Sequence, residues 1–212
     1  MLDKDILNDV HNFGCNLSSR EIFLHNHYGS DEDNPGVEYK MANTFIKNLR
    51  ILNQKSTDQI IIHMHSVGGE WSDGMAIYDA IRMSRCYVTI VAYGQVESMS
   101  SIIFQAADAR YLTPHTYFMS HFGSTAASGE YQNVQNWIKY EKQICDIMLD
   151  IYAKRCTKGA YFEEKYQGGQ TMGKVKNFLN TKLKSGDWYI NAEEAVHYGF
   201  ADKIIDTWQK LG

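Results

Sequence analysis

Three residues with side chains suited to serine-nucleophile chemistry stand beside apolar runs: Ser98, His121 and Asp187. A serine hydroxyl becomes an effective nucleophile only when a base takes its proton. A histidine can be that base and an aspartate can hold its tautomer, in any chain order. The chain has 8 histidines and 25 acidic residues, so chance triples are easy to find. Spacing alone therefore favours the simpler interpretation, in which Ser98 is only the N-cap of a helix.

Backbone donors for a developing oxyanion, which such a serine would need, are available in two turns. Met99 would begin a helix, where unpaired N–H groups collect at the positive dipole end. The turn SVGGE offers a second donor, because Gly68 and Gly69 let the backbone approach a ligand closely. Both turns would lie at the carboxyl ends of adjacent parallel strands, where sites tend to form.

The elements that must position these residues alternate between helix and strand. Apolar periodicity predicts helices over 38–53, 75–84 and the segment SMSSIIFQAAD, and strands over 59–65, 86–94, RYLT and TYFMSH. That order implies right-handed crossovers and a parallel sheet covered by helices. The strands show little polar alternation, as expected when both faces of a sheet are buried. The sequence therefore predicts one α/β domain.

The second half of the chain predicts a helical arm and a capped helix. A long helical pattern runs from Gly129 to Cys156, longer than one core usually needs, so we expect it to project and pack against another subunit. A further helical region covers about 171–184. In NAEEAVHYG, Asn191 and Glu194 form a capping box and Gly199 ends the helix, before a last strand in FADKII.

Composition excludes several classes of function. The net charge of −4 gives no reason to expect a nucleic-acid partner. Four cysteines without a CxxC pair indicate neither disulfides nor a zinc knuckle, and favour a reducing, cytoplasmic setting. The acidic N-terminus is unlike a signal peptide, and no apolar run approaches the ~18 residues of a membrane span. No phosphate-binding GxxxxGK[ST] loop is present.

Two histidine pairs have a spacing that metals use, His25 with His27 and His63 with His65. No cysteine or carboxylate cluster accompanies either pair, and a metal site needs a third ligand and supporting partners. The acidic stretch 30–34 lacks the residue order of a calcium-binding EF-hand loop. We therefore expect no metal site.

Four segments in order carry a resemblance to a known family: SVGGEWSDGMAIYDAI, YGQVESMSS, YFMSH and DWYINAEEAVHYGFADKI. From about Arg20 to Ile205 the chain resembles ClpP, the proteolytic subunit of the Clp protease. A divergent member, such as the ClpP-related proteases that phages use in head maturation, would fit as well.

The resemblance implies roles for individual residues. Ser98 takes the place of the nucleophile, His121 that of the general base and Asp187 that of the orienting acid. Gly69 and Met99 match the oxyanion donors. It also implies a crotonase-like fold of repeated β-β-α and βα units, with a twisted, mainly parallel sheet and a projecting handle helix.

On this resemblance residues 1–212 form a single serine peptidase domain, with an N-terminal segment over 1–19 and a handle over about 122–157. Family members form heptameric rings whose handles interlock two rings around a chamber, so we expect a homo-oligomer. An AAA+ unfoldase of the Clp type would feed peptide or protein substrates into that chamber. The chemistry needs no cofactor or metal.

The sequence departs from the family at several positions. Val67 replaces the proline of the usual Pro-Gly-Gly, and Glu97 stands where a small residue usually precedes the serine. The segments 25–36 and 158–186 are longer than is typical. Ile61 and His63 occupy positions where tyrosines commonly line the ATPase docking pocket. The catalytic residues therefore match the family better than the docking surface does.

Two other functions stay open at this point. One is a catalytically silent ring subunit that packs beside an active paralogue, for which Glu97 is the main argument. The other is a crotonase-fold enzyme acting on acyl-CoA, which shares the fold and the oxyanion donors. The Ser–His–Asp set argues against that second function, since thioester enolate chemistry needs no serine nucleophile.

Overall fold

A computed structural model of the chain describes residues 4–24 and 36–211. The strands are β1 (Cys15–Asn16), β2 (Glu21–Leu24), β3 (Ile60–Ser66), β4 (Val88–Glu97), β5 (Ala109–Leu112), β6 (Tyr117–Ser120), β7 (Trp188–Ile190) and β8 (Lys203–Ile204). The helices are α1 (Lys4–Phe13), α2 (Tyr39–Lys55), α3 (Trp71–Arg82), α4 (Met99–Phe104), α5 (Tyr131–Cys156), α6 (Ala160–Tyr166), α7 (Met172–Leu183) and α8 (Ala192–Tyr198), followed by a 3-10 turn, Trp208–Leu211.

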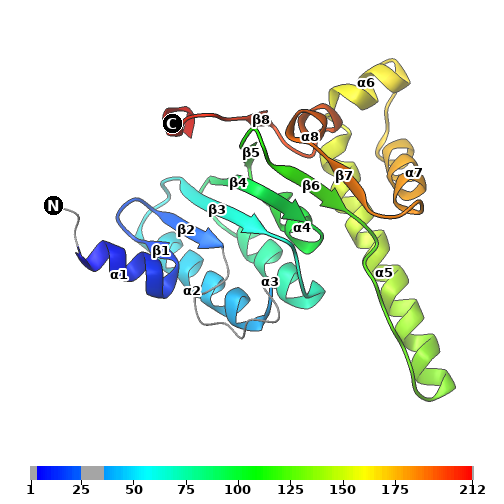
Figure 1. The fold of residues 1–212 in the computed structure, drawn as a ribbon, viewed down its shortest axis with the longest axis horizontal. Helices are drawn as coiled ribbons and strands as arrows, with labels where there is room; N and C mark the ends of the chain where they lie inside the picture. The colour runs from blue at the N-terminus through cyan, green and yellow to red at the C-terminus, as the bar shows by residue number, and fades with distance from the viewer. Residues whose placement is uncertain (1–3, 25–35, 212) are drawn as a thin grey trace.

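Within the described residues the strands form one eight-stranded sheet in the order β1-β2-β3-β4-β5-β8, with β6 paired to β4 and β7 to β6 (Figure 1). The pairs β1–β2 and β6–β7 are antiparallel and the others are parallel. Strands β3 and β4 lie at the centre and are mostly buried, β4 above all in its first half, which explains their apolar sequences. The expected α/β class with a mainly parallel sheet is confirmed.

Most predicted elements lie close to their expected places, but two have clearly different bounds, and α1, α6, β1, β2 and β7 were not predicted. Helix α3 begins at Trp71 rather than residue 75, because its first turn is too polar to show an apolar period. Strand β4 extends to Glu97, past the glycine at which we expected it to end. The seven-residue helix α6 was not predicted; its two Tyr, Phe and two Glu residues give no clear helical pattern over so short a stretch.

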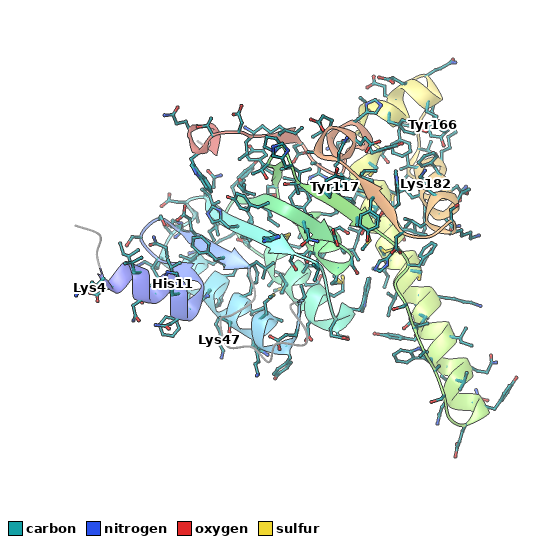
Figure 2. The ribbon with its side chains drawn as sticks, in the orientation of Figure 1. Lys4, His11, Lys47, Tyr117, Tyr166 and Lys182 are labelled. Carbon is teal, nitrogen blue, oxygen red and sulfur yellow. The ribbon has the colours of Figure 1, made fainter. Side chains whose placement is uncertain are left out.

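Helix α5 is 26 residues long and extends away from the rest of the molecule (Figure 1). Its fully buried residues all lie in the last turns, from Met148 to Cys156. Along its first half only the loop that follows β6 runs beside it (Figure 1), and Figure 2 shows most side chains of this half pointing outward. Helix α7 packs on the second half, where Lys176 Nζ lies 2.7 Å from Asp146 and 2.6 Å from Asp150.

Some expectations fall on residues outside the described part of the chain. These are nearly all of the loop 25–36, the pair His25 and His27, and the acidic stretch 30–34. In the described part no helix is long and apolar enough to cross a membrane. Cys15, Cys86, Cys145 and Cys156 are all free thiols.

Candidate functional site

Strand register brings Ser98, His121 and Asp187 together. Strand β4 runs parallel to β6, and the Ser98 N–H donates to the Met119 carbonyl at 2.9 Å, so Ser98 stands beside the end of β6. Strand β6 pairs antiparallel with β7, with Ser120 opposite Trp188. The next residue outward on each strand is then His121 on one and Asp187 on the other. Ser98 and His121, which are 23 positions apart, thus meet at one edge of the sheet. Asp187, which is 66 positions after His121, joins them there.

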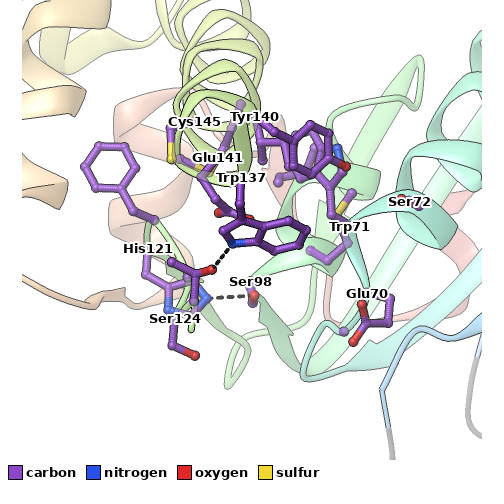
Figure 3. Close-up of a pocket in the computed structure, with 18 of the residues that line it drawn as sticks. Glu70, Trp71, Ser72, Ser98, His121, Ser124, Trp137, Tyr140, Glu141 and Cys145 are labelled. Atoms are coloured by element: carbon purple, nitrogen blue, oxygen red, sulfur yellow. Dashed lines mark hydrogen bonds between the residues drawn. The ribbon is translucent and has the colours of Figure 1, made fainter. Parts of the chain in front are cut away.

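The three side chains form a continuous hydrogen-bonded chain. His121 Nε2 lies 2.7 Å from Ser98 Oγ, and Figure 3 draws this bond. His121 Nδ1 lies 3.1 Å from Asp187 Oδ1. The carboxylate can only accept, so Nδ1 carries the proton in this pair and Nε2 is left to accept from the serine hydroxyl. The imidazole is about one-quarter exposed and the carboxylate about half exposed, so solvent reaches the His121–Asp187 pair.

The backbone at Ser98 is strained. Its φ is 52° and its ψ is −125°, a region that residues with a side chain rarely adopt. Such conformations cost about 1–3 kcal/mol and persist where surrounding structure imposes them, often at functional sites. Ser98 does precede α4, yet its side chain makes no capping hydrogen bond. Its hydroxyl is directed to His121 instead of the helix.

The glycine turn after β3 packs directly against this serine. A Cβ added to Gly68, whose φ is 98°, would stand 2.7 Å from the Glu97 carbonyl oxygen and from Ser98 Cβ, and 2.8 Å from Met99 N. Only glycine allows so close an approach in this conformation. Gly69, with φ at 146°, lies against Val37, which forms an isolated parallel bridge to it. Within the described residues neither the Gly69 N–H nor the Met99 N–H has an acceptor, so both are free to bind a ligand oxygen.

Buried serines behind the turn hold it in place. Ser100 Oγ donates to Ser66 Oγ at 2.6 Å, and Ser66 Oγ in turn accepts from the Gly68 N–H at 3.3 Å. Ser101 Oγ donates to the Ser98 carbonyl at 2.6 Å and also bonds the Tyr152 hydroxyl of α5 at 2.6 Å. These bonds join the end of β3 to α4 and to the glycine turn, and they join α4 and α5 to the carbonyl of Ser98. We did not predict these supporting roles, since isolated serines carry no sequence signal for them.

A cavity of about 380 Å³ opens beside Ser98 and His121 (Figure 3). Its walls come from the glycine turn, the start of α3, α4, the loop after His121, and α5. Helix α5 contributes Trp137, Tyr140, Glu141, Ile144, Cys145 and Met148. From the sequence we expected this helix to pack against another subunit; its helical period shows that these residues share a face, but not that the face borders Ser98.

The glutamate before the serine lies apart from this cavity. Glu97 is the last residue of β4, and its side chain lies on the same side of the strand as that of Gln95, two residues earlier. Its carboxylate accepts a 3.2 Å hydrogen bond from Gln95, and it is absent from the cavity wall.

Of the two histidine pairs with a spacing that metals use, His63 and His65 lie within the described residues. His63 is buried, with Nδ1 2.8 Å from the Tyr93 hydroxyl and its ring stacked on Phe23. Its Nε2 lies 3.6 Å from Glu21. Burial lowers the pKa of His63 below its ordinary value of 6.5, although Glu21 opposes this shift. Among the described residues no group of three His, Cys, Asp or Glu side chains is placed to hold a metal ion.

Comparison with known proteins places these features in a family. Residues 17–208 match the family described as Clp protease. The chain is 33% identical over 172 residues to the ATP-dependent Clp protease proteolytic subunit 2 of Pseudomonas aeruginosa, covering 80% of this chain and 77% of the relative. It is 28% identical to the corresponding proteolytic subunits of Deinococcus radiodurans (80% and 76% covered) and Dehalococcoides mccartyi strain BAV1 (89% and 83% covered). The resemblance drawn from the four sequence segments is confirmed.

Proposed function

The chain belongs to the Clp protease family, and from that premise we propose that it is a serine endopeptidase that uses Ser98, His121 and Asp187 as its catalytic triad. The observation that carries the proposal is the pair of hydrogen bonds linking the three side chains, at 2.7 Å and 3.1 Å. Nucleophile–base and base–orienter contacts of this length are what the chemistry requires.

In the first half of the reaction Ser98 Oγ attacks the peptide carbonyl while His121 Nε2 takes the hydroxyl proton. Asp187 holds the Nδ1–H tautomer and stabilises the imidazolium that forms. The attacked oxygen becomes an oxyanion, which the Gly69 and Met99 N–H groups stabilise from their positions beside Ser98. The strained backbone of Ser98 keeps its hydroxyl directed at His121 before substrate arrives.

In the second half His121 gives its proton to the leaving amine, and the peptide bond breaks to an acyl-enzyme. Water then enters, His121 takes one of its protons, and the acyl bond to Ser98 Oγ is hydrolysed. The described residues that take part are side chains and backbone N–H groups of this chain. The proposed mechanism calls for no metal or organic cofactor.

We further propose that the protein works as a homo-oligomeric ring, heptameric as the resemblance implies, in a single or stacked double ring. The relatives are named subunits of an ATP-dependent protease, which supports both an assembly and a separate ATP-hydrolysing unfoldase of the Clp type. The projecting half of α5 supports ring contacts, because Tyr131, Trp137 and Ile138 there are 78%, 42% and 41% exposed.

The two alternative functions make different demands on the same site. A silent ring subunit has no need of an aligned triad. The hydrogen bonds of His121 to Ser98 and to Asp187 therefore argue against that function. An acyl-CoA enzyme would use the oxyanion donors without the serine. The family membership and the triad geometry together favour the peptidase.

Hydrolysis of a fluorogenic peptide by wild type and variants tests the proposal. We expect Ser98→Ala to lower kcat by at least ~10⁴, because the triad acts as a unit. Asp187→Asn should lower it by on the order of 10³–10⁴ through loss of the correct tautomer. Ser128→Ala, at an exposed loop serine, should leave it unchanged. Hydrolysis that survives in Ser98→Ala would overturn the assignment.

A further inference from the structure

The cavity beside Ser98 is acidic as well as apolar. Its wall contains two carboxylates, Glu70 and Glu141, and, among the described residues, neither a lysine nor an arginine. Among the described residues of this wall, His121 is the only one with a titratable side-chain nitrogen, and the proposed triad uses it. A cavity of about 380 Å³ lies within the range of about 300–1,000 Å³ typical of ligand sites, where a few polar groups in an apolar wall set specificity.

Glu141 is the carboxylate that stands among the aromatic residues. It is half-buried, and within the described residues it has no ion pair and no hydrogen bond. Its helical neighbours three and four residues away are Trp137, Ile138, Ile144 and Cys145, so no cation lies at these spacings. Lys142 and Lys184 border a second cavity that Glu141 also lines, but neither forms an ion pair with it. The pKa of the Cys145 thiol is raised by burial and by the negative charge of Glu141, which agrees with a carboxylate directed toward that thiol.

Aromatic rings border this carboxylate. Trp137 and Tyr140 lie with ring centroids 5.6 Å apart, and Trp71 from α3 also lines the cavity. The indole of Trp137 is fixed by its Nε1–H, which donates to Thr125 Oγ1 at 2.8 Å (Figure 3). Rings around an unpaired carboxylate favour a cation twice: by charge pairing and by attraction of the cation to the ring faces.

We propose that this cavity accepts a lysine or arginine side chain of the substrate, with Glu141 as its counter-charge and Trp137 and Tyr140 as its aromatic walls. The stems of these side chains are apolar and would lie along Ile144 and Met148, while the charged head reaches the carboxylate. The inference rests on the proposed function, because it makes the cavity the site for a peptide side chain.

The position of the cavity assigns that side chain to one residue of the substrate. The attacked carbonyl must lie between Ser98 Oγ and the Gly69 and Met99 N–H groups, and all three residues line the cavity. The residue that supplies this carbonyl therefore directs its side chain toward α5. Glu141 then sets a preference for cleavage after lysine or arginine.

Phosphonate probes test this preference without relying on turnover. Three capped diphenyl phosphonates that differ only in carrying a lysine, norleucine or glutamate side chain react by one route. Ser98 Oγ forms a bond to phosphorus as the bond from phosphorus to one phenoxy oxygen breaks. The serine proton passes through His121 to that oxygen, and phenol leaves. Labelling rates would be followed by intact mass on the full-length wild type, Glu141→Gln, Glu141→Lys, and Glu130→Gln. Glu130 is exposed at the start of the same helix and does not line the cavity.

We expect the lysine probe to label wild type about fivefold faster than the norleucine probe, the size of a partly exposed charge pair. The ratio should fall to about one in Glu141→Gln and stay at its wild-type value in Glu130→Gln. In Glu141→Lys the glutamate probe should become the fastest, a gain that misfolding cannot produce. High salt should lower the wild-type ratio.

A separate reagent distinguishes failure of this inference from failure of the proposed function. If a simple alkyl fluorophosphonate labels Ser98 but the lysine-to-norleucine ratio is the same in wild type and Glu141→Gln, the cation preference is overturned and the peptidase stands. If the fluorophosphonate labels nothing, the proposed function falls and this inference with it.

Discussion

Ser98, the proposed nucleophile, is a single residue that the fold holds in a strained backbone conformation. Its positive φ costs about 1–3 kcal/mol, and its carbonyl, N–H and hydroxyl are each engaged by a different partner: Ser101, Met119 and His121. Those bonds fix the hydroxyl in place. The strain therefore accompanies the positioning of the proposed nucleophile and not the capping of α4.

His63 gives a residue-scale prediction about pH. Its pKa in the folded protein lies below its ordinary value of 6.5, because burial disfavours the charged ring. At pH values below about 6.5 this histidine therefore binds more protons in the unfolded chain than in the folded protein. As the pH falls, the free energy of unfolding falls by at most about 1.4 kcal/mol per pH unit from this group. Chemical denaturation from pH 7.5 to 5 should show this loss in wild type and a smaller one in His63→Gln.

The control for that experiment is His115→Gln, at an exposed loop histidine. It should follow the wild-type pH dependence. The account of His63 would be wrong if His63→Gln and wild type lost stability in parallel over the whole range.

The geometry of the site depends on how closely two elements approach each other, the turn after β3 and the start of α4. The turn after β3 and the start of α4 come within van der Waals contact only because Gly68 has no side chain. The same close packing places Met99 N, one of the two proposed oxyanion donors, against the glycine turn. An added methyl group at Gly68 would thus act on the geometry of the site as well as on packing.

Substituting Gly68 tests this contact. We expect Gly68→Ala to lower the free energy of unfolding by about 1–3 kcal/mol, because it combines a strained φ with overpacking. It should also slow fluorophosphonate labelling of Ser98 at least ~10-fold, the equivalent of about 1.4 kcal/mol. Thermal unfolding and labelling rates measure the two effects.

The same substitution elsewhere serves as the control. Gly173 lies in α7 with open space around it, and its nearest neighbour, Thr171 Oγ1, is 4.0 Å from the added Cβ position. Gly173→Ala should stabilise the protein by up to about 1 kcal/mol through helix propensity and leave labelling unchanged. Equal effects of the two variants on labelling would refute the role given to Gly68.

Sequence patterns predicted the elements better than their pairing. The apolar runs at β3 and β4 and the capping box at Asn191 have local causes, so they could be read from the chain. Strand β7 has only three residues, and its antiparallel pairing with β6 depends on tertiary contacts. The spacing of Ser98, His121 and Asp187 was therefore ambiguous until a family resemblance or this register was available.

At the scale of the whole molecule, α5 is both a wall of the cavity and the projecting arm. Its buried last turns hold Tyr152 against Ser101, while its first half exposes apolar side chains that a lone chain leaves in water. Assembly through this arm would link ring formation to the shape of the cavity. Sequence length and helical period predicted the arm, but not its second role beside Ser98.

Assembly can be tested on the arm itself. Ile138 is 41% exposed on α5 and is not part of the cavity wall beside Ser98. If the arm joins subunits, Ile138→Asp should shift the native mass to a smaller species by burying a charge at an apolar contact. Lys139→Asp, at the next and also exposed position, serves as control, and native mass spectrometry or light scattering reads the result. A wild type that stays monomeric at micromolar concentration would contradict the proposed ring.

The central claim is that Ser98 is an activated nucleophile, and labelling with an alkyl fluorophosphonate followed by intact mass tests it most directly. We predict one adduct per chain on wild type, no adduct on Ser98→Ala, and strongly slowed labelling of His121→Ala. An unlabelled wild type, or an adduct that persists in Ser98→Ala, would contradict the account.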